Sequence, residues 1–109
     1  MQLPASPFET IQWDEVEATE HAGITGFSRR RICQFGEISV RMVELSPDYL
    51  AEHWCEKGHV ILCLEGEVDV QLRDGRTFTL RPGMSCQVGD GIDAHRGYSS
   101  SGARLFVVD

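Results

Sequence analysis

His53-Trp54-Cys55-Glu56-Lys57-Gly58-His59 is the stretch of this chain that decides both the expected fold and the expected chemistry. In an extended strand the side chains alternate between the two faces, so His53 and Cys55 should point the same way. A tight turn at Lys57-Gly58 can then return His59 on the neighbouring strand. Neutral imidazole and thiolate are good ligands for first-row transition ions, so the stretch predicts a metal site built around one turn.

Period-two alternation dominates the rest of the chain, and we find no convincing stretch of helical periodicity. The expected strands are residues 27–35, 38–45, 50–55, 59–64, 67–72, 77–80, 85–88, 95–99 and 103–108. Turn-forming residues separate these runs, and Asp74-Gly75 between two alternating segments is a strong hairpin signal. Many short strands at close spacing predict an all-β barrel or sandwich.

The residues around the first two histidines follow the pattern H-x-C-x(3)-H-x(6)-G, from His53 to Gly66. This pattern resembles the first motif of the cupins, which is usually written G-x(5)-H-x-H-x(3,4)-E-x(6)-G. His53 takes the first ligand position, Cys55 that of the second histidine, and His59 that of the glutamate. Gly66 matches the closing glycine.

A second stretch, residues 83–99, resembles the second cupin motif, G-x(5)-P-x-G-x(2)-H-x(3)-N. The matched positions are the glycines Gly83 and Gly91, Gly89 in place of the proline, His95 after one extra residue, and Ser99 in place of the asparagine. Glu52-His53-Trp54-Cys55 is also similar to a small cupin subgroup with an Asp-His-Cys-Trp signature, whose biochemical role is unassigned. The resemblance covers the chain from roughly residue 35 to the C-terminus.

The resemblance implies one domain, a single-domain cupin with an antiparallel β-barrel of the jelly-roll (double-stranded β-helix) type. We expect this barrel in residues 26–109, preceded by an N-terminal segment, residues 1–25, that packs on it. The implied cofactor is a divalent transition metal (zinc, iron, nickel or manganese), and the implied ligands are His53, Cys55, His59 and His95. Cupins usually supply three histidines and a carboxylate, whereas this chain supplies three histidines and a thiol.

Cys55 has two interpretations. As a fourth protein ligand it closes a tetrahedral site and favours a structural or sensory role. As a neutral thiol packed beside the metal it leaves an open coordination position, as catalytic sites require. We slightly prefer the second interpretation, because three imidazoles already make a sufficient catalytic ligand set.

The cupin fold alone assigns no reaction, because cupins include dioxygenases, isomerases, decarboxylases, storage proteins and sensors. We expect a small metal-binding cupin that acts as a metal-dependent enzyme, of the oxygenase or isomerase type, on a small molecule in the barrel pocket. The alternative is a non-catalytic module that binds a metal or a small ligand. A third hypothesis is an empty pocket in a barrel that only assembles with partners.

The composition limits the kinds of partner that the protein is expected to bind. The net charge of −7 and a pI near 5.0 oppose binding to nucleic acid or to an anionic membrane. The N-terminus has no secretory signal, which predicts a cytoplasmic protein. The four cysteines show no C-x-x-C spacing and are expected to be free thiols.

Strand parity predicts which faces need a cover. With His59 inward, Val60, Leu62 and Leu64 form an outward aliphatic row, which is unusual on a solvated sheet. Either of two covers is expected: the N-terminal segment, anchored by Phe8, Ile11 and Trp13, or the second subunit of a homodimer.

Parity also places the charged residues of two strands. The apolar residues of strand 38–45, taken as its core face, put Glu44 inward and Arg41 outward. For Glu44 a solvent-exposed strand end is preferred over a carboxylate that supports the site. The Arg29-Arg30-Arg31 run predicts an exposed strand edge protected by charge.

Overall fold

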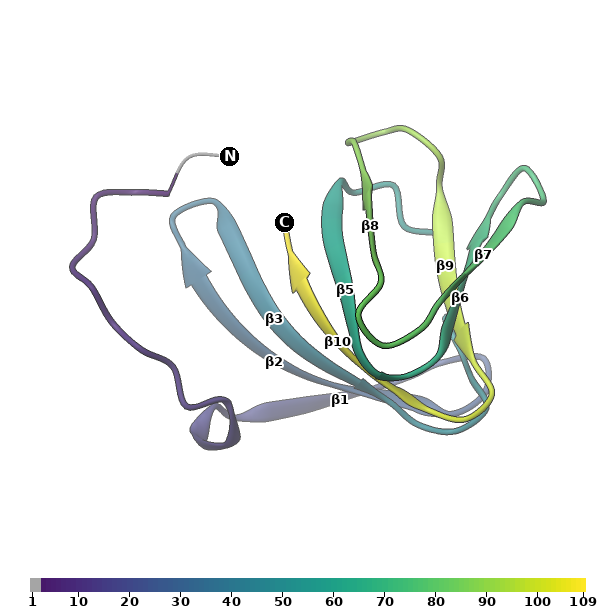
Figure 1. The fold of residues 1–109 in the computed structure, drawn as a ribbon, viewed down its shortest axis with the longest axis horizontal. Coiled ribbons are helices and arrows are strands. Elements are labelled where there is room, and N and C mark those ends of the chain that lie inside the picture. The colour runs from purple at the N-terminus through teal and green to yellow at the C-terminus, as the bar shows by residue number, and fades with distance from the viewer. Residues whose placement is uncertain (1–2) are drawn as a thin grey trace.

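Two antiparallel sheets form the protein in the computed structural model, which describes residues 3–109 (Figure 1). The large sheet has the strand order β1-β2-β3-β10-β5-β8, and the small sheet has the order β4-β9-β6-β7. The strands are β1 (Ala18–Ala22), β2 (Phe27–Phe35), β3 (Ile38–Leu45), β4 (Tyr49–Leu50), β5 (His59–Gly66), β6 (Val68–Leu72), β7 (Thr77–Leu80), β8 (Ser85–Val88), β9 (His95–Ser99) and β10 (Ala103–Val108). A short 3-10 helix, η1 (Trp13–Glu15), precedes β1.

The predicted all-β architecture is confirmed, and the strands expected at 27–35, 38–45, 77–80, 85–88, 95–99 and 103–108 have the observed bounds. Alternating side chains and turn residues account for this agreement. The hairpin predicted at Asp74-Gly75 joins β6 to β7, where Gly75 has φ of 105°. Only glycine reaches such a backbone conformation without strain, so the turn residue fixes the hairpin.

The apolar core lies between the two sheets. On the inner face of the large sheet, Val43, Leu105 and Cys63 lie side by side across β3, β10 and β5, and Cys63 has no exposed surface. Val68 and Val70 from the small sheet complete the same cluster. Burying one valine or leucine side chain contributes about 1.5–3 kcal/mol, so this cluster holds the sheets together.

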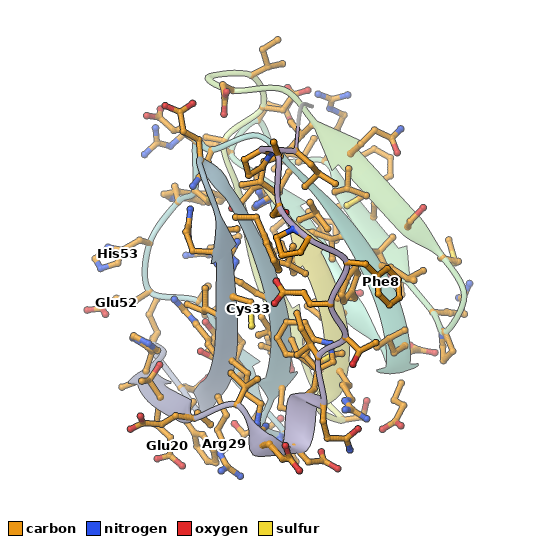
Figure 2. All side chains as sticks on the ribbon, turned by 90° about the vertical axis from the view of Figure 1, so that its left-hand side faces the viewer. Phe8, Glu20, Arg29, Cys33, Glu52 and His53 are labelled. Carbon is orange, nitrogen blue, oxygen red and sulfur yellow. The ribbon has the colours of Figure 1, made fainter. Side chains whose placement is uncertain are left out.

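The N-terminal segment crosses the outer face of the large sheet (Figure 2). Trp13 packs edge-on against Phe106 of β10, with ring centroids 6.4 Å apart. Phe8, however, is 94% exposed, so its expected role as an anchor is wrong. Val60 and Leu64 keep 44% and 37% of their surface exposed, and a homodimer that covers them stays a prediction.

Strand β1 was not expected, and it changes the interpretation of the arginine run. It pairs with β2 from Ala18↔Arg31 to Ala22↔Phe27, so the prediction that the arginines form an exposed edge is wrong. This strand lies before residue 26, whereas the domain boundary that we placed there stays a prediction. Within residues 3–109, none of the helices is long and apolar enough to span a membrane.

The two faces of β3 are the reverse of the expected ones. Glu44 lies on the outer face, where its Oε1 is 2.8 Å from Nη1 of Arg31. Arg41 lies on the inner face, opposite Val107 of β10. Both faces of β3 carry apolar residues, since Val43 and Leu45 share the parity of Arg41, so alternation alone does not identify the core face.

Candidate metal centre

Two of the expected ligands face each other across a backbone bridge. Cys55 pairs with His95, the first residue of β9, through hydrogen bonds of 2.7 Å from Cys55 N to His95 O and 3.0 Å from His95 N to Cys55 O. His95 is 5% exposed and Cys55 is partly buried. The bridge therefore fixes a thiol and an imidazole beside one another at the edge of the small sheet.

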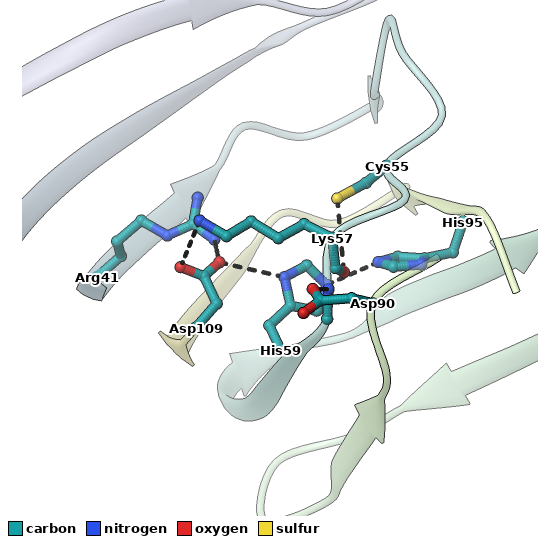
Figure 3. Close-up of polar contacts among 8 residues, drawn as sticks. Arg41, Cys55, Lys57, His59, Asp90, His95 and Asp109 are labelled. Carbon is teal, nitrogen blue, oxygen red and sulfur yellow. Dashed lines mark hydrogen bonds and ion pairs between the residues drawn. The ribbon is translucent and has the colours of Figure 1, made fainter. Parts of the chain in front are cut away.

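His59 approaches these two residues from the large sheet. Its Nε2 lies 2.6 Å from Nε2 of His95, and the rings meet edge to face (Figure 3). The candidate ligand atoms of Cys55, His59 and His95 all lie within 4.8 Å of one another. The sequence-based prediction brought these three residues together, and the structure places them in one group.

The segment before His59 is held by a contact that the sequence did not reveal. Asp90 accepts a hydrogen bond of 2.6 Å from the backbone N–H of Gly58 through its Oδ1. A Cβ atom at Gly58 would lie 2.7 Å from the backbone nitrogen of Asp90, so any larger residue would displace this segment. The tight turn expected at Lys57-Gly58 is wrong: the segment leads from Cys55, which pairs with the small sheet, to β5 of the large sheet, and no turn is formed at residues 56–58.

The hydrogen bonds of the outer ring nitrogens determine what the inner ones can do. His95 Nδ1 lies 3.0 Å from the carbonyl oxygen of Asp93, which can only accept, and His59 Nδ1 lies 3.4 Å from Oδ2 of Asp109. In the tautomer that donates Nδ1–H to these two oxygens, each neutral ring carries a lone pair on Nε2. Burial, followed by the charge of His95, lowers the pKa of His59 and favours this neutral form.

Two lone pairs 2.6 Å apart repel each other unless a positive ion lies beside both. Imidazole Nε2 atoms with their Nδ1–H groups bonded to a carboxylate or a carbonyl are the usual arrangement of histidine metal ligands. The thiol of Cys55 adds a third donor that suits the same ions. The residues present thus fit a divalent transition ion.

His53 lies apart from this group. Its side chain is 87% exposed, and its Nε2 is 3.6 Å from Oε2 of Glu52 (Figure 2). The expectation that His53 points inward with Cys55 assumed a continuous strand over residues 50–55, but β4 ends at Leu50 and the chain bends at residues 52 and 53. The period-two argument does not hold across such a bend.

Sequence reasoning missed three charged residues beside His59. The Asp109 carboxylate, 2% exposed, contacts His59 Nδ1, Arg41 Nη2 at 2.5 Å and Lys57 Nζ at 3.4 Å (Figure 3). A carboxylate that accepts from a metal-binding imidazole orients the ring and raises its basicity. Asp109 is therefore a positioning residue, and two cations stabilise its charge.

Replacing Asp109 by asparagine is expected to weaken binding of Zn²⁺ by about 10- to 100-fold, the usual effect of losing the carboxylate behind a ligand histidine. Competition with a chromophoric chelator measures this change. Asp74→Asn is the matched control, since it removes one carboxylate from an exposed hairpin that asparagine also suits. Equal affinities of the two variants would show that Asp109 does not position His59.

A cavity of about 780 Å³ opens in front of the group. Cys55, His59 and His95 line it together with apolar residues of both sheets and with two inward arginines, Arg30 and Arg41. Its volume is that of pockets for small molecules. The three candidate ligands thus border a space large enough for a substrate.

Solved structures with a similar fold include several cupins, whereas no protein-family profile and no curated protein sequence matches the chain. A protein from Thermotoga maritima described as a predicted oxalate decarboxylase matches with a TM-score of 0.77 and 14% identity, over 92% of this chain and 96% of that one. The ectoine synthase of P. lautus matches with a TM-score of 0.76 and 17% identity, over 93% of this chain and 76% of that one. A sugar phosphate isomerase of a cupin superfamily from Silicibacter pomeroyi matches with a TM-score of 0.71 and 15% identity, over 92% of this chain and 74% of that one.

At these identities the likeness concerns the fold. The chain has the cupin fold, which confirms the expectation from the two sequence motifs and from the strand pattern. Proteins with this fold carry out different reactions, so the chemistry of this chain has to be argued from its own residues.

Proposed function

We propose that Cys55, His59 and His95 hold a divalent transition ion, which presents an open coordination position to the cavity. On this proposal the protein is a small metal-dependent enzyme, of the oxygenase or isomerase type, that acts on a small molecule. The pair of imidazole Nε2 atoms at 2.6 Å carries the proposal, because both rings have an oxygen acceptor beside the other nitrogen, Nδ1.

The number of protein ligands favours a site that binds a substrate. With His53 87% exposed, three protein donors remain, and a site with three protein ligands keeps a position for water or substrate. A bound ion there supplies Lewis-acid polarisation of a coordinated group. The thiolate and two imidazoles favour zinc, iron or nickel over manganese, which prefers oxygen ligands.

Structures of similar fold support an enzyme, since they include an ectoine synthase and a sugar phosphate isomerase. One observation favours the alternative, a binding module without turnover. The carboxylates among the cavity-lining residues in the described range 3–109 are Glu20 and Glu52, whose side chains are 65% and 60% exposed. Neither is buried next to the ion site, where a general base would be expected.

Cobalt substitution tests the ligand set. Protein reconstituted with Co²⁺ is expected to show a near-ultraviolet sulfur-to-cobalt charge-transfer band, because Cys55 would bind as thiolate. Cys55→Ser should lose this band. Cys33→Ser should keep it, since Cys33 lies on the outer face of β2 (Figure 2).

Two outcomes would contradict the proposal in different ways. A Co²⁺ complex of the wild type without the band would remove Cys55 from the ligand set and restore its interpretation as a packing residue. Failure of the folded wild type to retain Co²⁺ or Zn²⁺ through gel filtration would reject the metal site altogether.

A further inference from the structure

Three arginines line the cavity of a protein that is acidic overall. Arg96 of the small sheet lies over the Trp54 ring and donates a hydrogen bond to Gln71, whereas the other two belong to the large sheet. The chain has a net charge of −7, yet Arg30 and Arg41 lie on the inner face of the large sheet and line the cavity. They occupy adjacent strands and are diagonal neighbours, because Arg30 is opposite Val43 and Arg41 is opposite Ile32. Such diagonal pairs lie within reach of long side chains, so the two guanidinium groups share one part of the cavity.

The charge of Arg41 is already balanced, whereas that of Arg30 is not. Arg41 forms an ion pair with Asp109, although its Nε is buried without a hydrogen-bond partner. Arg30 donates a hydrogen bond of 3.1 Å from Nε to Oγ of Ser28, which is 1% exposed. Across residues 3–109 no carboxylate forms an ion pair with Arg30.

The acidic residue of the neighbouring strand, Glu20, also lines the cavity, but it does not pair with Arg30. Glu20 of β1 is paired in register with Arg29, and its carboxylate lies 3.7 Å from Arg29 Nε. Strand parity puts Arg29 and Arg30 on opposite faces of β2. Arg30 is therefore a partly buried cation held by a buried hydroxyl, with its two terminal nitrogens available to a ligand.

Apolar side chains from both sheets line much of the same cavity. Val43, Leu105, Val107 and Ile61 line the large-sheet side, and Val68 and Val70 line the small-sheet side. On the large-sheet side, Arg30 without a carboxylate partner and the apolar side chains beside it suit a ligand with one negative charge on an apolar body. Carboxylate matches the planar fork of a guanidinium, whereas a phosphate dianion would bring a second charge without a partner.

We propose that this cavity binds a small carboxylic acid with an apolar body, whose carboxylate pairs with Arg30. The proposal rests on the proposed function, since it assigns the ligand class of the same cavity. Arg30 is not one of the candidate metal ligands, so the proposal can also be tested on metal-free protein.

Phenylacetate serves as the probe, with phenylacetamide as its uncharged counterpart and phenyl phosphate as the dianion. Isothermal titration measures the binding of each to the wild type, to Arg30→Gln and to the matched control Arg29→Gln, with Zn²⁺-loaded and with metal-free protein. Arg30→Gln is expected to weaken phenylacetate binding by about tenfold or more, the usual value of a hydrogen-bonded charged group, in both preparations. Arg29→Gln, which removes the same charge from the opposite face, should bind phenylacetate like the wild type.

Four results would overturn the proposal. The first is that the wild type does not bind phenylacetate up to about 10 mM, which corresponds to a binding free energy weaker than about 3 kcal/mol. The second is that Arg30→Gln and Arg29→Gln weaken phenylacetate binding equally. The third and fourth are that phenylacetamide binds as well as phenylacetate, or that phenyl phosphate binds more tightly than phenylacetate. Circular dichroism confirms that each variant is folded. If the wild type retains no Zn²⁺ but metal-free protein binds phenylacetate through Arg30, the proposed metal function fails while the ligand class stands.

Discussion

Replacing His95 by alanine is expected to abolish metal retention, with a loss of metal affinity greater than about 100-fold. Mutating residues that only hydrogen-bond to metal ligands already lowers metal affinity by about 10- to 100-fold. His95 is 5% exposed, and its ring is fixed by Asp93 O on one nitrogen and faces His59 on the other. Its removal leaves one imidazole and one thiol. Metal content per folded chain, measured by plasma mass spectrometry after gel filtration, checks the result.

His53→Ala is the matched control for this experiment. Both variants remove one imidazole from a motif that resembles the cupin ligand set, but His53 is 87% exposed and lies outside the group of Cys55, His59 and His95. We expect His53→Ala to retain about one ion per chain, like the wild type. Loss of metal in both variants would restore the four-ligand set expected from the sequence and would require the segment around His53 to move inward.

The structure shows why the sequence predicted one part of this centre and not the rest. Cys55 and His59 are close in sequence and belong to one motif that resembles the cupin pattern, so their proximity was predictable, although the turn expected between them is not formed. His95 belongs to a second motif at a spacing that resembles the cupin pattern, so its position was also predictable. His53 was placed by parity alone, and the bends at residues 52 and 53 interrupt the strand that parity assumes.

The charged residues around His59 had no local signal. Asp109 reaches His59 because β10 lies between β3 and β5 in the large sheet, which is a property of strand order rather than of spacing. Arg41 was placed on the wrong face because both faces of β3 are apolar. Which of the two faces of β3 belongs to the core depends on which face the small sheet covers.

Strand boundaries were predictable where alternation and turn residues agree, as for β2 and β3. Strand β1 was missed altogether, because its sequence Ala-Thr-Glu-His-Ala has no apolar alternation and its residues are mostly exposed. This strand forms because the outer edge of β2 is available for pairing, from Ala18↔Arg31 to Ala22↔Phe27. Tertiary pairing of this kind overrides the local preference of a segment.

Gly66 ends β5 with φ of 71°, next to the register shift between Arg104 and Leu105 that bends the β5–β10 pairing. A Cβ atom there would overlap the carbonyl oxygen of Gly102 and lie 2.9 Å from Cα of Ala103. Both contacts are with backbone, so no side-chain rotation relieves them. The close approach of two chains at this point requires glycine.

Gly66→Ala is therefore expected to destabilise the protein by roughly 2–5 kcal/mol, with about 1–2 kcal/mol from the left-handed backbone and about 1–3 kcal/mol from the overlap. For a domain of this size the melting temperature should fall by roughly 15 °C. Gly91→Ala isolates the backbone contribution, because Gly91 also has φ of 71° but has no atom within 4 Å of its added Cβ. It should lose only about 1–2 kcal/mol. Thermal unfolding followed by circular dichroism compares the two variants, and an equal loss in both would show that the β5–β10 contact relaxes at no cost.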